Sequence, residues 1–269
     1  MSEPVVLVSA RERILEVVLN RPEKYNALTL EMAEAIFAAT RQLADDPDLR
    51  VLLIRANGKY FSAGADLNGG LFPDTNLKSP SAFRKWYRNG KGSLHPLHDE
   101  FEAIEKPIVI AHHGPCLGGA LEMSLSCDFR LAARSARYAL PETAIGALPG
   151  SGGTSRLTRL VGPQWARWFI MANLPMEAER ALAIGLVHDV YPDEEFQTRV
   201  WDFCLNLAAQ PPETVGAAKL AIELCADLDR AQARNIERLS NSALVMGEEH
   251  HQLVAAMRER LSRGKAKGG

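Results

Sequence analysis

The chain has 269 residues, of which 46% are hydrophobic and 24% charged, so it can bury one large core or two modest ones. Its 31 basic and 33 acidic residues give a formal net charge of −2, which excludes the strongly basic class of proteins that bind nucleic acid or anionic membranes. The four cysteines form no C-x-x-C pair and lie in apolar surroundings, which predicts reduced core residues. The chain start lacks a signal-peptide pattern, and no apolar run approaches the roughly 18 residues that span a bilayer. We therefore expect a cytoplasmic protein with no membrane partner.

The first part of the chain predicts a hairpin, a helix and a buried strand. Residues 5–9 and 14–19 are β-branched runs separated by a short polar turn, which is typical of a hairpin. Thr29 can cap a helix that runs to about Leu43. Residues 51–54 are a continuous apolar run, which indicates a strand that is buried on both faces.

The middle of the chain alternates between helices and strands. Residues 68–89 are rich in Gly, Pro, Asn and Ser, with aromatic residues interspersed, which predicts a mobile loop and a short helix. Another helix ends near Glu105 and leads into a buried strand at residues 108–111. A turn and a helix follow over residues 114–127, and a strand over 128–133. Strand, glycine-rich turn, helix and strand in this order predict the α/β class.

The last third of the chain is mainly helical. After Gly162 we expect helices over residues 163–172, 176–184, 194–208, 212–225, a long stretch from residue 229, and 248–261. The domain organisation that follows is an α/β core over residues 1–190 and a C-terminal helical region over residues 191–269.

Two glycine-containing turns can present backbone N–H groups to a ligand. In the first, Gly64 lets the chain turn so that the Ala65 N–H points into a cleft, although an ordinary strand-to-helix turn with Asp66 as N-cap fits the same residues. In the second, Gly118-Gly119 precedes a helix, and an ordinary helix start explains that segment equally well by itself. Two such donors on one carbonyl oxygen would stabilise an enolate-like charge, and each would raise the reaction rate by roughly 10²–10³-fold.

Two glutamates accompany these turns. Glu122 follows Gly119 by three residues, so both lie on the same side of the first helical turn. Most glutamates are exposed, but Glu122 lies in an apolar helix and Glu142 lies between apolar segments, which favours a cleft for both. Desolvation and mutual repulsion there would raise at least one pKa, as acid/base chemistry requires.

Other motifs lose their support when their spacing is considered. His112 and His113 are adjacent strand residues and point to opposite faces, so they cannot chelate one metal ion, and His250-His251 fits a solvated helix face. The glycine-rich residues 150–155 fit neither G-x-G-x-x-G nor a P-loop, and no G-x-S-x-G elbow occurs. We predict no metal site and no dinucleotide, ATP or serine-hydrolase chemistry.

Taken together, the segments resemble the crotonase (enoyl-CoA hydratase/isomerase) superfamily. The matching motifs are NRPEKYNAL at 20–28, FSAGADL at 61–67, GPCLGGALE at 114–122, PE at 141–142, LPGSGGTSRL at 148–157 and residues 181–190. They cover about residues 5–220 in the order and spacing of that superfamily. The resemblance implies a spiral of repeated ββα units and a C-terminal helical region that builds homotrimers, often paired as homohexamers.

The resemblance also implies an acyl-CoA substrate. Its thioester carbonyl oxygen would lie between the N–H groups of Ala65 and Gly119, and the segment around residues 24–27 would hold the adenine and phosphates of CoA. The expected CoA-binding residues are Lys24, Asn26, Ala27, Ala63, Asp66 and Leu67. No separate cofactor is implied, because coenzyme A enters as part of the substrate.

Hydratases of the superfamily carry two glutamates at the positions of Glu122 and Glu142, whereas double-bond isomerases generally keep only the second. By analogy Glu122 would orient and activate water for attack on Cβ, and Glu142 would handle the proton delivered to Cα. We therefore expect a 2-enoyl-CoA hydratase. The alternatives are an enoyl-CoA isomerase, a related enzyme for an unusual acyl group, and a catalytically silent acyl-CoA-binding assembly platform.

Overall fold

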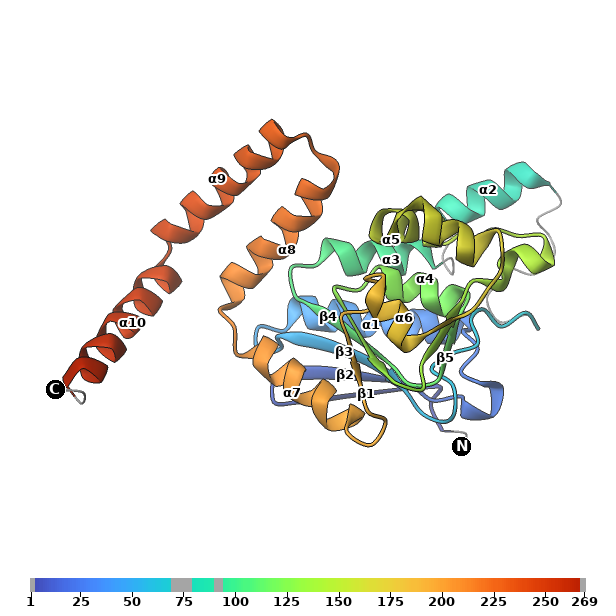
Figure 1. Cartoon of the computed structure of the whole chain (residues 1–269), viewed down its shortest axis with the longest axis horizontal. Coiled ribbons are helices and arrows are strands. Elements are labelled where there is room, and N and C mark those ends of the chain that lie inside the picture. The colour runs from blue at the N-terminus through green and yellow to red at the C-terminus, as the bar shows by residue number, and fades with distance from the viewer. Residues whose placement is uncertain (1–2, 69–78, 90–93, 267–269) are drawn as a thin grey trace. The chain divides into compact units, whose positions relative to one another are not determined.

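A six-stranded sheet forms the centre of the structure, a computed structural model that describes residues 3–68, 79–89 and 94–266 (Figure 1). The strand order is β1-β2-β3-β4-β6-β9. Strands β1 and β2 form the predicted antiparallel hairpin, and every later neighbour pairs in parallel. The strands are β1 (Val6–Arg11), β2 (Ile14–Leu19), β3 (Val51–Ala56), β4 (Ile108–His112), β6 (Phe129–Ala133) and β9 (Asp189–Tyr191).

The sheet is covered on both faces, as the continuous apolar strands predicted. Leu52 and Ile54 of β3 belong to the larger core cluster, whereas Val51 and Leu53 belong to a second cluster on the opposite face, because successive strand residues point to opposite sides. The larger cluster packs against helices α1 (Leu30–Asp45), α3 (His95–Ala103) and α4 (Gly119–Leu125), and the second against α7 (Phe196–Ala208). The Thr29 hydroxyl caps α1 as predicted, accepting from the Met32 N–H at 3.2 Å.

A second, three-stranded sheet organises the loops at one end of the first. It contains β5 (Pro115–Leu117), β7 (Arg137–Ala139) and β8 (Met176–Glu177), of which β5 and β7 are parallel and β7 and β8 antiparallel. Isolated bridges pair Ser62 with Cys116 and Leu28 with Ala65. The segment that follows β3 therefore lies beside the strand that leads into α4.

Helix α5 (Gly153–Ile170) begins earlier than the sequence indicated. The expected start at residue 163 marks a kink, because Gly162 has φ of 78° and ψ of 162° and Pro163 opens the second arm. The first arm was missed because its Gly, Ser and Thr residues are also typical of turns. The other short helices are α2 (Pro80–Asn89), α6 (Ala178–Ala183) and the 3₁₀ turns η1 (Pro22–Lys24) and η2 (Pro141–Ile145). Most of the loop predicted before α2 falls on residues 69–78, outside the described residues.

Residues 209–269 form a compact unit separate from residues 1–208. This unit contains α8 (Pro212–Asp227), α9 (Arg230–Met246) and α10 (Glu248–Ala266), and α9 contacts both of the others. The Glu249 carboxylate accepts from the N–H groups of Glu213 and Thr214, which ties α10 to the start of α8. Helix α7 belongs to the first unit, so the two compact units divide after residue 208. The expected end of the functional core at residue 190 is a different boundary, and it stays a prediction. None of the helices described is long and apolar enough to cross a bilayer.

Candidate active site

A cavity of about 640 Å³ lies in the first unit, where the turns after β3 and β5 meet α2, η2 and the start of α5. Its lining is mostly apolar, and its polar side chains come from Tyr87, Glu122, Glu142 and Ser151. Both glutamates singled out in the sequence line it. So do four of the other predicted site residues, namely Ala63, Ala65, Leu67 and Gly119.

The two predicted N–H donors come from turns whose backbones nearly touch. Gly64 has φ of 89°, and a Cβ at that position would lie 2.7 Å from the Leu117 carbonyl oxygen and 3.3 Å from the Gly119 nitrogen. A Cβ on Gly119 would lie 3.6 Å from the Ala65 nitrogen. Among the described residues, neither the Ala65 nor the Gly119 N–H donates a hydrogen bond. Two N–H groups without a partner among the described residues therefore lie close together in the cavity wall. The Asp66 carboxylate accepts from the N–H of Asn68, as an N-cap would, and the helix that this alternative needs would fall on residues 69–78, outside the described residues, so the alternative stays open.

Glu122 is 4% exposed and projects from the first turn of α4. Its Oε2 atom accepts from the N–H of Ser151 at 2.7 Å and from that of Gly153 at 2.9 Å. Burial raises the pKa of Glu122 to about 7; the hydrogen bond from Gly153 opposes this rise, and the charge of Glu142 adds to it. The carboxylate is thus fixed by one oxygen and titrates near neutrality.

Glu142 lies on the other side of the cavity, in the 3₁₀ turn η2 that Pro141 begins. Its Oε1 atom packs against Gly118, where a Cβ would lie 2.8 Å away. Its Oε2 atom is buried, and no described residue bonds to it. Burial raises the pKa of Glu142 above its ordinary value. Both carboxyl groups therefore retain protons more readily than free glutamate, as the sequence led us to expect.

Of the remaining predicted CoA-binding residues, Lys24, Asn26 and Ala27 lie in the loop that contains η1, and Asp66 lies in the turn after β3. The Asn26 side chain is fully buried and bonds to the backbone of Arg21, Asn57 and Tyr60. Asp66 pairs with Arg21 at 3.1 Å, and the same guanidinium donates to the Ala27 carbonyl. We therefore expect Asn26 to stabilise the conformation of this loop. A direct role in CoA binding stays a prediction for exposed residues such as Lys24.

Sequence reasoning placed part of the pocket wall in residues 68–105 but did not name the residues that α2 contributes to it. Phe83 and Tyr87 line the cavity from successive turns of this helix, and their rings lie 5.4 Å apart. The Tyr87 hydroxyl bonds to Ser151 and lies next to Gly150, where a Cβ would approach it within 2.7 Å. The i, i+4 spacing of the two aromatic residues was the signal in the sequence. The sequence also singled out the glycine-rich residues after Leu148, which fit no phosphate-binding motif. In the structure, the N–H groups of Ser151 and Gly153 in this segment donate to the Glu122 side chain.

The adjacent histidines have separate partners. His112 Nδ1 lies 3.2 Å from the Tyr138 hydroxyl, whereas His113 Nε2 lies 2.9 Å from the Gly58 carbonyl. Within the described parts of the chain, no three His, Cys, Asp or Glu side chains are arranged to hold a metal ion.

Comparison with known proteins identifies the family. The model of the enoyl-CoA hydratase/isomerase family matches residues 9–262. Over 95% of both chains, the sequence is 30% identical to 2,3-dehydroadipyl-CoA hydratase of Escherichia coli (strain K12), and over 85% of both it is 34% identical to crotonyl-CoA hydratase of Syntrophomonas wolfei. An enoyl-CoA hydratase structure from Bacillus anthracis superposes with a TM-score of 0.85 at 27% identity, covering 95% of this chain and 96% of that one. The fold, the cavity and these relatives agree, and the chain belongs to the enoyl-CoA hydratase/isomerase family of the crotonase superfamily.

Proposed function

We propose that this protein is a 2-enoyl-CoA hydratase, which adds water in the syn sense across the double bond of a trans-2-enoyl-CoA thioester to give a 3-hydroxyacyl-CoA. The observation that carries the proposal is the presence of two carboxyl groups, Glu122 and Glu142, in one cavity with two free backbone N–H groups. The hydratase names of relatives at about 30% identity support it.

The carbonyl oxygen of the thioester would accept hydrogen bonds from Ala65 and Gly119. Polarisation of this carbonyl makes Cβ electrophilic, and the same two donors stabilise the enolate-like charge that develops when oxygen attacks there. Main-chain donors fixed by close packing need little reorganisation during the reaction. The apolar walls exclude competing water, which strengthens both hydrogen bonds.

The two glutamates would supply the proton chemistry. The Ser151 and Gly153 N–H groups occupy Oε2 of Glu122, so Oε1 is left to hold a water molecule. As the water oxygen bonds to Cβ, Glu122 accepts its proton, and Glu142 delivers a proton to Cα. The pair begins with one proton and ends with one, and exchange with solvent restores the starting distribution. The reactive state is the singly protonated pair, which predicts a bell-shaped pH dependence.

The reaction transfers only the elements of water, so the proposal includes no metal or redox cofactor. Coenzyme A would enter and leave as part of the thioester, with its phosphates near Lys24. We also propose assembly as a homotrimer or a homohexamer through the C-terminal helices.

The test is loss of the absorbance of the conjugated enoyl thioester, followed with crotonyl-CoA and a long-chain homologue. Wild type should turn over at least one of them, and Glu122→Gln and Glu142→Gln should each lose 10²–10⁴-fold, roughly the contribution of a general acid or base. Binding of the product 3-hydroxyacyl-CoA should change much less, which separates catalysis from folding.

Other outcomes would point elsewhere. A product with a moved double bond and no new hydroxyl would identify an isomerase. Binding of acyl-CoA with turnover no faster than buffer, across all chain lengths, would identify a silent binding protein.

A further inference from the structure

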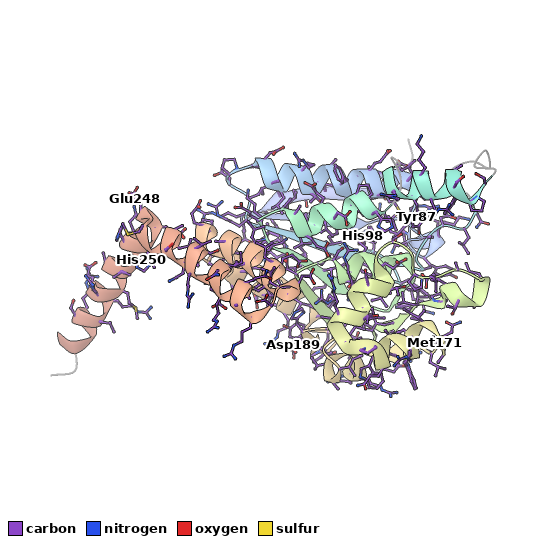
Figure 2. The ribbon with its side chains drawn as sticks, turned by 90° about the horizontal axis from the view of Figure 1, so that it is seen from above. Tyr87, His98, Met171, Asp189, Glu248 and His250 are labelled. Atoms are coloured by element: carbon purple, nitrogen blue, oxygen red, sulfur yellow. The ribbon has the colours of Figure 1, made fainter. Side chains whose placement is uncertain are left out.

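The loop that binds Glu122 is itself held by helix α3. His98 is 0% exposed, and its Nδ1 atom lies 2.8 Å from the Ser151 carbonyl oxygen. Because a carbonyl can only accept, Nδ1 carries the proton and donates it. The N–H of the same residue, Ser151, donates to Glu122 at 2.7 Å. Ser151 therefore makes one hydrogen bond to His98 through its C=O and one to the Glu122 carboxylate through its N–H (Figure 2 labels His98).

The chemistry of His98 rules out a role as a proton carrier. Burial, together with the nearby charges of Arg156 and His95, lowers the pKa of His98 to about 3, although the hydrogen bond to the Ser151 carbonyl opposes this fall. The ring is thus neutral at any working pH. Its Nε2 atom is buried and finds no partner among the described residues, which costs stability. An apolar side chain could fill this space without burying an unpaired nitrogen. The function of His98 must therefore depend on its Nδ1–H hydrogen bond.

A second contact from α3 fixes the other side of the loop. Arg156, in the first turn of α5, donates to both carboxylate oxygens of Glu102 at 2.5 and 2.6 Å, and to Asp99 at 3.1 Å. This fork geometry holds the start of α5, where the Gly153 N–H donates to Glu122. Helix α3 therefore contacts this segment at two residues, Ser151 and Arg156, close to the two N–H groups that donate to the carboxylate.

We propose that His98 is a positioning residue for Glu122, acting through the backbone of Ser151. The Nδ1–H bond fixes the Ser151 carbonyl, and the loop so fixed aims the Ser151 N–H at the catalytic carboxylate. The proposal rests on the proposed function in one respect, that Glu122 must be ionised to accept a proton from water.

Three variants separate positioning from packing. In His98→Asn the side-chain amide can occupy the position of Nδ1, in His98→Gln it reaches only the position of Nε2, and His98→Leu fills the space without a donor. The other groups that face Glu122, namely Glu142, Arg156 and Tyr87, are the same in all three.

The first readout is the pH dependence of kcat/KM. We expect His98→Leu and His98→Gln to lose about tenfold in kcat and to move the acidic limb to higher pH by half a unit or more, because the anion loses a well-aligned donor. His98→Asn should restore both. An unchanged limb in the Leu variant, or equal behaviour of the Asn and Gln variants, would overturn the proposal.

The second readout needs no turnover. Infrared difference titration, with Glu122→Gln as the reference, follows the protonation of this carboxyl in the free protein. The pKa of Glu122 should be higher in His98→Leu than in wild type. If His98→Leu does not fold, the pKa should be higher in His98→Gln than in His98→Asn. An identical titration in every variant would refute the role of His98. Failure of hydratase activity with a shifted titration would refute the proposed function alone.

Discussion

Gly153 packs directly against the side chain of Glu122. A Cβ at position 153 would lie 2.6 Å from Cγ and 2.7 Å from Oε2 of the glutamate, and 2.9 Å from Cβ of Pro149. The N–H of the same glycine donates to the carboxylate at 2.9 Å. The close approach of backbone and carboxyl group is thus possible only without a side chain at this position.

Gly153→Ala should therefore displace the carboxylate. We expect kcat to fall by roughly 10²-fold, the order of a lost general base, with a much smaller change in thermal stability, since alanine favours the helix. The matched control is Gly162→Ala in the same helix, where no atom lies within 4 Å of the new Cβ but φ is 78°. That variant should lose about 1–3 kcal/mol of stability, because its φ and ψ suit only glycine, and should keep its kcat. Equal kcat values for the two variants would contradict the geometry.

Gly64→Ala should disturb the two N–H donors. The added methyl group would lie 2.7 Å from the Leu117 carbonyl oxygen and push apart the turns that hold Ala65 and Gly119. We expect a loss of roughly 10²–10³ in kcat, the value of one oxyanion donor. Gly185→Ala has a similar positive φ in open space and serves as the control for backbone strain. Comparison of kcat per folded molecule, with folding checked by circular dichroism, decides between a local and a global effect.

The raised pKa of Glu122 makes stability depend on pH. The folded protein holds this proton up to a pH of about 7, whereas an unfolded chain releases it near the ordinary value of 4.5. The folded state thus binds more protons between these values, so the free energy of unfolding falls as pH rises from about 4.5 to about 7 and then levels off. Glu122→Gln should remove this contribution, on the order of 2–3 kcal/mol.

Urea unfolding of wild type and Glu122→Gln at pH 5 and pH 8, at one protein concentration, measures this effect. The variant should gain stability relative to wild type at pH 8 compared with pH 5. Glu142 has a pKa raised in the same direction, but it is present in both proteins and cancels. If the free energy of unfolding depends on pH in the same way in both proteins, the pKa of Glu122 is not raised in the folded state.

The C-terminal unit should mediate self-association. Leu239 and Met246 of α9 are 69% and 78% exposed, and Ile222 of α8 is similarly open. Apolar side chains on three helices need a partner surface, which we expect from further copies of this chain. Sedimentation should give a trimer or hexamer, and Leu239→Glu with Met246→Glu should shift it toward smaller species. Asn241→Glu, an exposed polar position on the same helix, should leave the mass unchanged, and a monodisperse wild-type monomer would exclude the idea.

The elements found from the sequence are those with long, periodic signals. The apolar run in β3 and the Thr29 cap of α1 each depend on neighbouring residues, so local physics determines them. Strands β7 and β8 have three and two residues and are set by tertiary pairing, for which no local pattern exists. The same holds for η2, whose turn orients Glu142.

The site divides in the same way. The burial of Glu122 followed from its apolar helix, because an unpaired carboxylate there needs compensation. The source of that compensation did not follow, since Ser151 and Gly153 lie 29 and 31 residues further along the chain. His98 and Tyr87 were missed for the same reason: each acts by contact with Ser151, and such contacts exist only once the chain is folded.

The main-chain bridges from Ser62 to β5 and from Ala65 to Leu28 have an evolutionary consequence. The N–H groups of Ala65 and Gly119 belong to the main chain, so they survive the loss of either glutamate side chain. Glu122 and Glu142, by contrast, can each be exchanged by one codon. On the proposed function, a duplicated copy that lost either carboxylate would keep both main-chain donors for the thioester, and it could acquire a different reaction without rebuilding its backbone.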